Sequence, residues 1–297
     1  MSRPRPVLSP VRSVLYVPAS RPHMLAKLPS LQADAVVIDL EDGVAPGEKS
    51  AARGHLRAAA ERRVFDESPP WSLRVNSAGS AWFDDDLGLA AELRPPRVVL
   101  AKAETTDRVE MLGRTCETWG GRVGLMIETA LGVGRVRELG GAHPAVDLLI
   151  YGSADYRLAI GARPDPGRDW ERHALHEILL AARMHDCLAI DSVFFHFRDA
   201  EGLRRDAGVA RDLGFDGKSC IHPAQVPVIH EVFASTPREI DWARTVLRAW
   251  SEQDGDSRGV VVLDGEMIEA LHVRLAERLL GRIRNVPISP AQGEGSP

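Results

Sequence analysis

Residues 97–128 read RVVLAKAETTDRVEMLGRTCETWGGRVGLMIE. The stretch begins with a short apolar run, 97–102, and ends with a second one, 122–128. Between them, apolar residues recur on one face of a helix with charged residues opposite. Two short apolar runs joined by a helical segment are typical of a βαβ unit, in which the helix connects two parallel strands. The stretch therefore predicts an α/β protein with a parallel sheet.

The same alternation occurs eight times along the chain. Apolar runs short enough for buried parallel strands lie at 13–18, 35–41, 72–76, 97–102, 122–128, 147–153, 188–193 and 217–222. Helical periodicity lies between them, for example at 48–62, 106–119, 170–186 and 199–213. Eight consecutive units predict a closed (β/α)8 TIM barrel over residues 11–236. A doubly wound open sheet is the alternative, but no Gly-rich G-x-G-x-x-G turn follows the first run.

The chain continues after the eighth unit, and residues 237–285 predict a C-terminal helical and lid extension. Its parts are a helix at 237–252, a Gly/Asp/Ser linker at 254–259, an apolar run at 260–263 and an amphipathic helix at 266–284. Eight βα units close a barrel without it. Residues 1–10 and 286–297 are rich in Pro, Gly and Ser and lack periodicity, so we predict disordered tails there.

Composition excludes several classes of protein. The 297 residues carry 37 basic and 42 acidic side chains, a net charge of −5, so no basic field favours nucleic acid or an anionic membrane as a partner. The chain contains no run of eighteen apolar residues, so we predict no transmembrane helix. The three cysteines are odd in number and far apart, which favours buried thiols in a reducing cytoplasm over a disulfide framework. We expect a soluble cytoplasmic protein.

Polar residues end several of the predicted strands, and in a (β/α)8 barrel catalytic groups come from the C-terminal ends of strands. Glu128 and Asp155 end two neighbouring strands, which lie about 4.8 Å apart in a sheet, so their carboxylates could share one cation. Two carboxylates are enough for Mg²⁺, which completes its octahedral shell with water and substrate oxygens. The alternative is that each carboxylate caps the helix that follows. The pairing favours the metal site.

Two cationic side chains, Arg74 and Lys102, end other predicted strands. Arg74 is costly to bury alone, so we expect an anionic partner: either Glu41 or Asp42, or a substrate carboxylate held bidentately. Lys102 is open to two interpretations, a catalytic or substrate-binding group or an ion-pair partner of Glu41 or Glu104.

At these residues the chain resembles the citrate lyase β-subunit-like, or HpcH/HpaI aldolase, family, and the likeness extends from about residue 15 to residue 280. The matching stretches are 15–22 LYVPASRP, 39–46 DLEDGVAP, 74–76 RVN, 101–104 AKAE, 127–129 IET, 152–155 GSAD and 217–223 GKSCIHP. The resemblance implies a (β/α)8 barrel, Mg²⁺ held by Glu128 and Asp155, and Arg74 contacting the carboxylate or ketone oxygen of a 2-oxoacid. The stretch 262–268 is similar to the family's lid motif, which implies that Asp264 completes a neighbouring subunit's site in a homo-oligomer.

The activity implied is a retro-Claisen cleavage of a β-hydroxyacyl thioester, of the citryl-, malyl- or citramalyl-CoA type, into an acyl thioester and a 2-oxoacid. A general acid must protonate the departing enolate carbon, and Asp264 by resemblance or Glu41 through water are the two candidates. Three alternatives stay open. They are a synthase that adds thioester hydrolysis, a class I aldolase with a Schiff base on Lys102, and a noncatalytic subunit that binds CoA or an acyl carrier.

Overall fold

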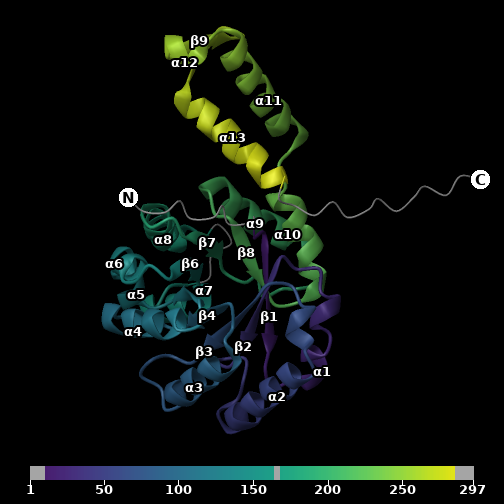
Figure 1. Cartoon of the computed structure of the whole chain (residues 1–297), viewed down its shortest axis with the longest axis vertical. Helices are drawn as coiled ribbons and strands as arrows, with labels where there is room; N and C mark the ends of the chain where they lie inside the picture. Colours follow the sequence, from purple (N-terminus) through teal and green to yellow (C-terminus); the bar gives the residue numbers. More distant parts are fainter. Residues whose placement is uncertain (1–10, 164–167, 285–297) are drawn as a thin grey trace, which may run out of the picture. The chain divides into compact units, whose positions relative to one another are not determined.

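The computed structural model describes residues 11–163 and 168–284, and the predicted tails 1–10 and 286–297 lie outside them. Eight parallel strands form a closed barrel in the order β1 to β8, and β8 pairs with β1 (Figure 1). The strands are β1 Ser13–Pro18, β2 Ala35–Asp39, β3 Trp71–Val75, β4 Arg97–Leu100, β5 Arg122–Ile127, β6 Val146–Tyr151, β7 Leu188–Asp191 and β8 Gly217–Cys220. The predicted TIM barrel is confirmed.

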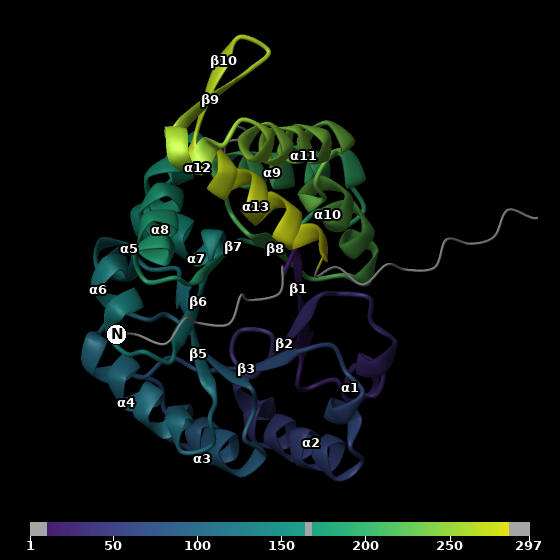
Figure 2. The same ribbon diagram turned by 45° about the horizontal axis from the view of Figure 1, so that its top comes forward.

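Helices between the strands surround the barrel, as Figure 2 shows. They are α1 Pro22–Leu25, α2 Lys49–Glu61, α3 Phe83–Leu93, α4 Thr106–Glu117, α5 Ala130–Gly134, α6 Val136–Gly141, α7 Ser153–Ile160, α8 Arg172–Met184, α9 Ala200–Leu213 and α10 Val226–Phe233. Each longer helix turns its apolar face to the strands; α2, for example, buries Ala52, Leu56 and Ala59.

The core has two parts because the strand side chains alternate between the barrel interior and the helices. The interior is filled by Val14, Val37, Val99, Met126, Leu148, Ile150, Ile190 and Ala35. A larger apolar cluster lies between strands and helices and includes Ile38, Leu73, Leu125 and Leu149. Strands buried on both sides explain why the sequence shows continuous apolar runs rather than alternation.

Several strands end earlier than the sequence predicts. The predicted strand 35–41 ends at Asp39 and the strand 97–102 ends at Leu100. Lys102 has a left-handed backbone, with φ 49°, which no strand residue adopts. The predicted strand 147–153 ends at Tyr151, because Ser153 begins α7. In each case the polar residues leave the strand to enter the loop at the C-terminal end of the barrel.

The contacts divide the chain into a unit of residues Val11–Phe233, the barrel, and a second unit that includes the segment from Ala234 onward. The second unit contains α11 Pro237–Glu252, α12 Gly255–Arg258, β9 Val260–Leu263, β10 Glu266–Glu269 and α13 Ala270–Arg284. β9 and β10 form an antiparallel hairpin. Val246, Trp250, Val261, Ile268 and Ala276 form its own small core.

The structure corrects two details of the predicted extension. The helix expected at 266–284 begins only at Ala270, because Glu266–Glu269 pairs with β9 as a strand. The linker expected at 254–259 contains the short helix α12. Across the described ranges, no helix is both long and apolar enough to cross a membrane.

Candidate active site

Asp39 and Arg74 form the base of a polar cluster at the C-terminal ends of the strands. They are register partners on β2 and β3. The Arg74 guanidinium donates from Nε to Asp39 Oδ1 at 2.7 Å and from Nη2 to Oδ2 at 2.6 Å, and its Nη1 lies 3.2 Å from Glu41 Oε2. Of the two expected partners of Arg74, Glu41 and Asp42, Glu41 is one. The pairing with Asp39 was not predicted, although Asp39 is the first residue of the stretch 39–46.

The turn after β2 is organised by the Asp39 carboxylate. Its oxygens also accept the backbone N–H groups of Glu41 at 2.8 Å and Gly43 at 2.9 Å. A Cβ at Gly43 would lie 2.5 Å from Asp39 Oδ2, so only glycine fits. Burial alone would raise the pKa of Asp39, but the charge and hydrogen bonds of Arg74 outweigh it and hold this pKa below its usual value.

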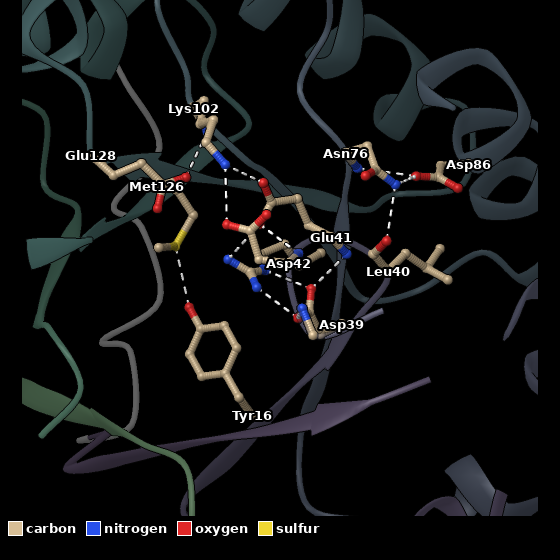
Figure 3. A network of polar contacts seen from close by, with 12 residues as sticks. Tyr16, Asp39, Leu40, Glu41, Asp42, Asn76, Asp86, Lys102, Met126 and Glu128 are labelled. Atoms are coloured by element: carbon tan, nitrogen blue, oxygen red, sulfur yellow. Dashed lines mark hydrogen bonds and ion pairs between the residues drawn. The ribbon is translucent and has the colours of Figure 1, made fainter. Parts of the chain in front are cut away.

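Glu41 and Lys102 form an ion pair above this base (Figure 3). The Lys102 ammonium donates to Glu41 Oε1 and, at 3.2 Å, to Asp42 Oδ2. Glu41 Oε2 accepts the Asp42 N–H at 2.8 Å. Burial raises the pKa of Glu41, and the charge of Arg74 and the hydrogen bond from Lys102 oppose that shift. Glu41 thus lies between the two predicted cations.

Glu128, the residue after β5, is the most deeply buried carboxylate among the predicted site residues, at 2% exposed. Its Oε1 accepts the backbone N–H of Lys102 at 2.8 Å. Burial raises the pKa of Glu128 to about 7; the charges of Glu41 and Asp155 add to the shift, and that of Arg74 opposes it. A buried carboxylate that neighbouring anions destabilise is a group that a bound cation would stabilise.

The lack of a side chain at Gly152 leaves the space that the Glu128 side chain occupies. A Cβ at Gly152 would lie 2.5 Å from both Cβ and Oε2 of Glu128. Gly152 follows β6 and precedes α7, whose first turn carries Asp155. The half-buried Asp155 is near enough for its charge to raise the pKa values of Glu128 and Lys102. The segment 152–155, at the beginning of α7, therefore provides the space for one carboxylate and supplies the other.

The donor set fits magnesium better than zinc. Within residues 11–163 and 168–284, no group of three or more His, Cys, Asp or Glu side chains is placed to hold a metal, as structural zinc would require. Mg²⁺ uses one or two carboxylates and fills its other positions with water and substrate oxygens. The buried Glu128 and the half-buried Asp155 match that requirement.

Tyr16 on β1 lies beneath the cluster and is not one of the predicted site residues. The Arg74 guanidinium lies over its ring, 5.1 Å from the centroid. The phenol donates to Met126 Sδ at 3.2 Å, as Figure 3 shows. Burial raises the pKa of Tyr16 well above its usual value. Tyr16 is therefore an uncharged side chain against which the Arg74 guanidinium packs.

Five of the six predicted site residues, all but Asp264, belong to the barrel unit. Asp264 belongs to the second unit, where it forms the two-residue turn of the β9–β10 hairpin with Gly265. Both turn residues have positive φ, 50° and 84°, as a tight hairpin turn of the Asp-Gly type requires. Asp264 is exposed at the tip of this turn.

Comparison with known proteins agrees with this fold. The family model for HpcH/HpaI aldolase/citrate lyase matches residues 12–223. A (3S)-malyl-CoA thioesterase of Cereibacter sphaeroides is 36% identical over 276 residues, covering 92% of this chain and 94% of the relative. The mitochondrial citramalyl-CoA lyase of Rattus norvegicus is 32% identical over 291 residues, with 91% and 85% covered.

A solved structure is similar over nearly the whole chain. Protein CitE from Mycobacterium tuberculosis, in complex with magnesium, acetoacetate and coenzyme A, has a TM-score of 0.77 and 34% identity, covering 91% of this chain and 97% of that one. The family match extends through all eight strands of the barrel. The chain therefore belongs to the HpcH/HpaI aldolase/citrate lyase family.

Proposed function

We propose that the protein is a Mg²⁺-dependent carbon–carbon lyase that cleaves a β-hydroxyacyl-CoA thioester into an acyl-CoA and a 2-oxoacid. The observation that carries the proposal is the pair Glu128 and Asp155, a buried carboxylate directly after β5 and a half-buried one in the first turn of α7, which follows the adjacent strand β6, beside the cations Arg74 and Lys102. Relatives named for citramalyl-CoA lyase and a neighbour crystallised with magnesium, acetoacetate and coenzyme A support the substrate class.

Glu128 and Asp155 are the residues that would hold Mg²⁺. When bound, the ion would supply Lewis-acid polarisation of the substrate's hydroxyl and carboxylate oxygens. The backbone N–H of Lys102 orients Glu128 by its bond to Oε1.

Arg74 would contact one substrate oxygen. Asp39 occupies Nε and Nη2 of its guanidinium, so the bidentate face is already used within the protein. Nη1, which lies toward Glu41, is the nitrogen that faces the rest of the cluster. We therefore favour contact with the oxygen that becomes the ketone of the 2-oxoacid over a two-pronged grip on a carboxylate.

Proton movement would fall to carboxylates of this chain. The substrate hydroxyl loses its proton as the carbon–carbon bond breaks, and the thioester enolate that leaves must gain a proton on carbon. Glu41 is our candidate for either transfer through water, and Asp264 of a neighbouring subunit is the second candidate for the donor. This role for Asp264 requires a homo-oligomer. We also place the protein in the cytoplasm, because Cys116, Cys187 and Cys220 are buried free thiols.

Thioester hydrolysis is the second candidate function, because relatives are named (3S)-malyl-CoA thioesterase. The contact between Ser13 and His230 does not provide a serine nucleophile for this hydrolysis. Ser13 Oγ lies 2.8 Å from His230 Nε2, and that nitrogen lies 3.3 Å from Asp34. However, Ser13 is fully buried at the N-terminal end of β1 and accepts the Asp34 N–H at 3.0 Å. Hydrolysis would therefore use water at the carboxylate site.

The Schiff-base alternative is less favourable than the metal mechanism. A lysine nucleophile must be a neutral amine, which requires a lowered pKa. The Glu41 and Asp42 carboxylates instead bind the Lys102 ammonium. Burial alone would lower the pKa of Lys102, but the hydrogen bond and charge of Glu41, with the charges of Glu128 and Asp155, raise it above its usual value. A noncatalytic CoA-binding role would not account for the neighbouring carboxylates Glu128 and Asp155.

One assay separates these functions. Purified protein is incubated with malyl-CoA and with citramalyl-CoA, with Mg²⁺ or with excess chelator, and both 2-oxoacid and free CoA thiol are measured. A lyase releases the 2-oxoacid and leaves the thioester intact, whereas hydrolysis releases thiol alone, and a synthase-type reaction requires acyl-CoA and 2-oxoacid together. Release of neither product from either ester, or full activity in chelator, would contradict the proposal.

A further inference from the structure

Lys49, the first residue of α2, is a buried lysine whose ammonium bonds only uncharged oxygens. It is 4% exposed. It donates to the carbonyl of Leu40 at 2.7 Å, the carbonyl of Glu41 at 2.8 Å and Asn76 Oδ1 at 2.8 Å. These bonds use all three N–H donors of the ammonium. No carboxylate bonds this ammonium directly, so the bonds that offset the cost of burying its charge are those to two backbone carbonyls and Asn76, with the Trp82 ring 5.0 Å away.

Two of the three acceptors of Lys49 are the carbonyls on either side of the Glu41 α-carbon. The peptide before Glu41 is held at both ends: its carbonyl accepts Lys49 and Asn76 Nδ2, and its N–H donates to Asp39. The carbonyl of the peptide after Glu41 accepts Lys49 and the N–H of Val44. Fixing both flanking peptides fixes φ and ψ of Glu41, and therefore the direction in which its side chain leaves the backbone.

A second layer holds Lys49 itself in place, and part of it is visible in Figure 3. Asn76 Nδ2 donates to Asp86 Oδ2 at 2.6 Å, and the Asn76 N–H donates to the same oxygen at 3.0 Å. The other oxygen of Asp86 accepts Arg53 at 2.9 Å. The reverse orientation of the Asn76 amide would point its NH₂ group at the Lys49 ammonium, so the network allows one arrangement.

Lys49 has no donor left for a substrate, because Leu40, Glu41 and Asn76 accept its three N–H groups, and both oxygens of the fully buried Asp86 already accept hydrogen bonds from Arg53 and Asn76. Their effect must pass through the backbone of residues 40 and 41. We propose that Lys49, supported by Asn76 and Asp86, is a positioning residue that directs the Glu41 carboxylate at the Lys102 ammonium. The inference rests on the proposed function only in giving Glu41 a part in the reaction.

Competitive acetylation tests this positioning without an activity assay. The chain contains four lysines, Lys27, Lys49, Lys102 and Lys218. Exposed Lys27 serves as the internal reference. The full-length protein in Mg²⁺ buffer is treated with limiting acetic anhydride, and the ratio of Lys102 to Lys27 modification is measured by peptide mass spectrometry. Pairing with Glu41 keeps the Lys102 amine protonated and slow to react, so Glu41→Gln should raise the ratio of Lys102 to Lys27 acetylation. The ratio in this variant is the value expected when the pairing is lost completely.

Lys49→Met should raise the Lys102 ratio toward that of Glu41→Gln, by about tenfold if the lost pairing is equivalent to one unit of amine pKa. The matched control is Arg97→Met, which removes a cation bound to the buried Asp147 at 2.7 and 2.9 Å, at the beginning of β4. Its ratio should equal that of wild type. Asn76→Ala, which leaves Lys49 in place but removes one of its acceptors, should give a smaller rise and serves if Lys49→Met does not fold.

A wild-type ratio in Lys49→Met, or in Asn76→Ala where only that variant folds, overturns the inference. Kinetics give a second criterion. With whichever CoA ester the protein cleaves, Lys49→Met should lower kcat about ten- to a hundredfold and change KM much less. In a Glu41→Gln background the same substitution should add little, because it acts through Glu41. If the two substitutions instead lower kcat by independent factors that multiply in the double variant, the positioning role of Lys49 is contradicted. If neither ester is cleaved, the proposed function fails, while the acetylation ratio still decides the positioning.

Discussion

Asp39 Oδ1 and Oδ2 accept two hydrogen bonds, of 2.7 and 2.6 Å, from Arg74, so a carboxylate of the protein occupies the forked side of the guanidinium. The sequence left two interpretations of Arg74, an internal ion pair or a substrate contact. The geometry confirms the ion pair, with Nη1 3.2 Å from Glu41, and the substrate contact that we propose would use Nη1. A strand-end arginine can therefore have both roles.

Arg74→Lys should be severely impaired in kcat/KM and also less stable. An ammonium cannot reproduce the two parallel bonds to Asp39, so part of a buried ion pair is lost. We expect a loss of about 1–3 kcal/mol in the free energy of unfolding, measured by urea denaturation, together with the kinetic loss. A variant that keeps wild-type stability but loses activity would show that the Asp39 pair contributes little to folding.

Acid should weaken the Asp39–Arg74 pair in a defined direction. The folded-state pKa of Asp39 lies below its unfolded value of about 3.9, so its contribution is fully present above about pH 4 and is lost as pH falls through the folded value. Asp39→Asn should cost about 3–5 kcal/mol at neutral pH, and this difference from wild type should shrink as pH falls below 4. A difference independent of pH would contradict the assignment.

The sequence predicted the eight strands, because burial on both faces makes their apolar runs continuous. It also singled out Glu41, Arg74, Lys102 and Glu128, because polar residues at the ends of such runs are conspicuous, and the structure brings these four into one cluster. It could not identify the Asp39 pairing, since which side chains face each other depends on the register between β2 and β3. Lys49 was missed for a related reason: its contacts form only when the start of α2 packs under the turn after β2.

Gly152→Ala should weaken metal binding without straining the backbone. Gly152 has φ −113° and ψ 90°, which alanine adopts, but the new Cβ would lie 2.5 Å from Glu128 Oε2. Glu128 must then move, and we expect a rise of about tenfold or more in the Mg²⁺ concentration for half-maximal activity. Gly134→Ala is the control, because a Cβ there meets nothing within 4 Å. Equal Mg²⁺ dependence in the two variants would contradict the role of Gly152.

Glu128→Gln and Asp155→Asn should each abolish Mg²⁺-dependent turnover while circular dichroism remains that of the folded protein. Both substitutions keep the shape of the side chain and remove the charge, so a loss of at least about hundredfold would reflect the cation rather than packing. Asp107→Asn, in the first turn of α4, is the control for an exposed carboxylate. Unchanged activity in either site variant, across a Mg²⁺ titration, would remove that residue from the metal site.

The C-terminal hairpin shows where local sequence signals compete. The apolar periodicity of 266–284 predicts one helix, yet its first four residues form β10. Asp264-Gly265 is the strongest short-range signal for a hairpin, and it places Glu266 opposite Leu263. The turn chemistry therefore overrides the helical periodicity at the beginning of the segment.

The remaining prediction is that Asp264 completes the site of a neighbouring subunit in a homo-oligomer. The hairpin tip presents an exposed carboxylate, and Val262 and Met267 on the hairpin are 60% and 62% exposed, an apolar surface of the kind that protein contacts cover. Asp264→Ala and Glu128→Ala should each be inactive alone. Mixed under conditions that exchange subunits, they should recover part of the activity, because some hybrid interfaces combine an intact Asp264 with an intact Glu128. Exchange is verified by native mass spectrometry of the mixture, and mixing Glu128→Ala with Asp155→Ala is the control, since both lesions lie in the barrel and no interface restores a site. If exchange occurs and activity returns in neither mixture, or if the protein is a fully active monomer, then Asp264 acts within its own chain or not at all, and Glu41 is left as the candidate proton donor.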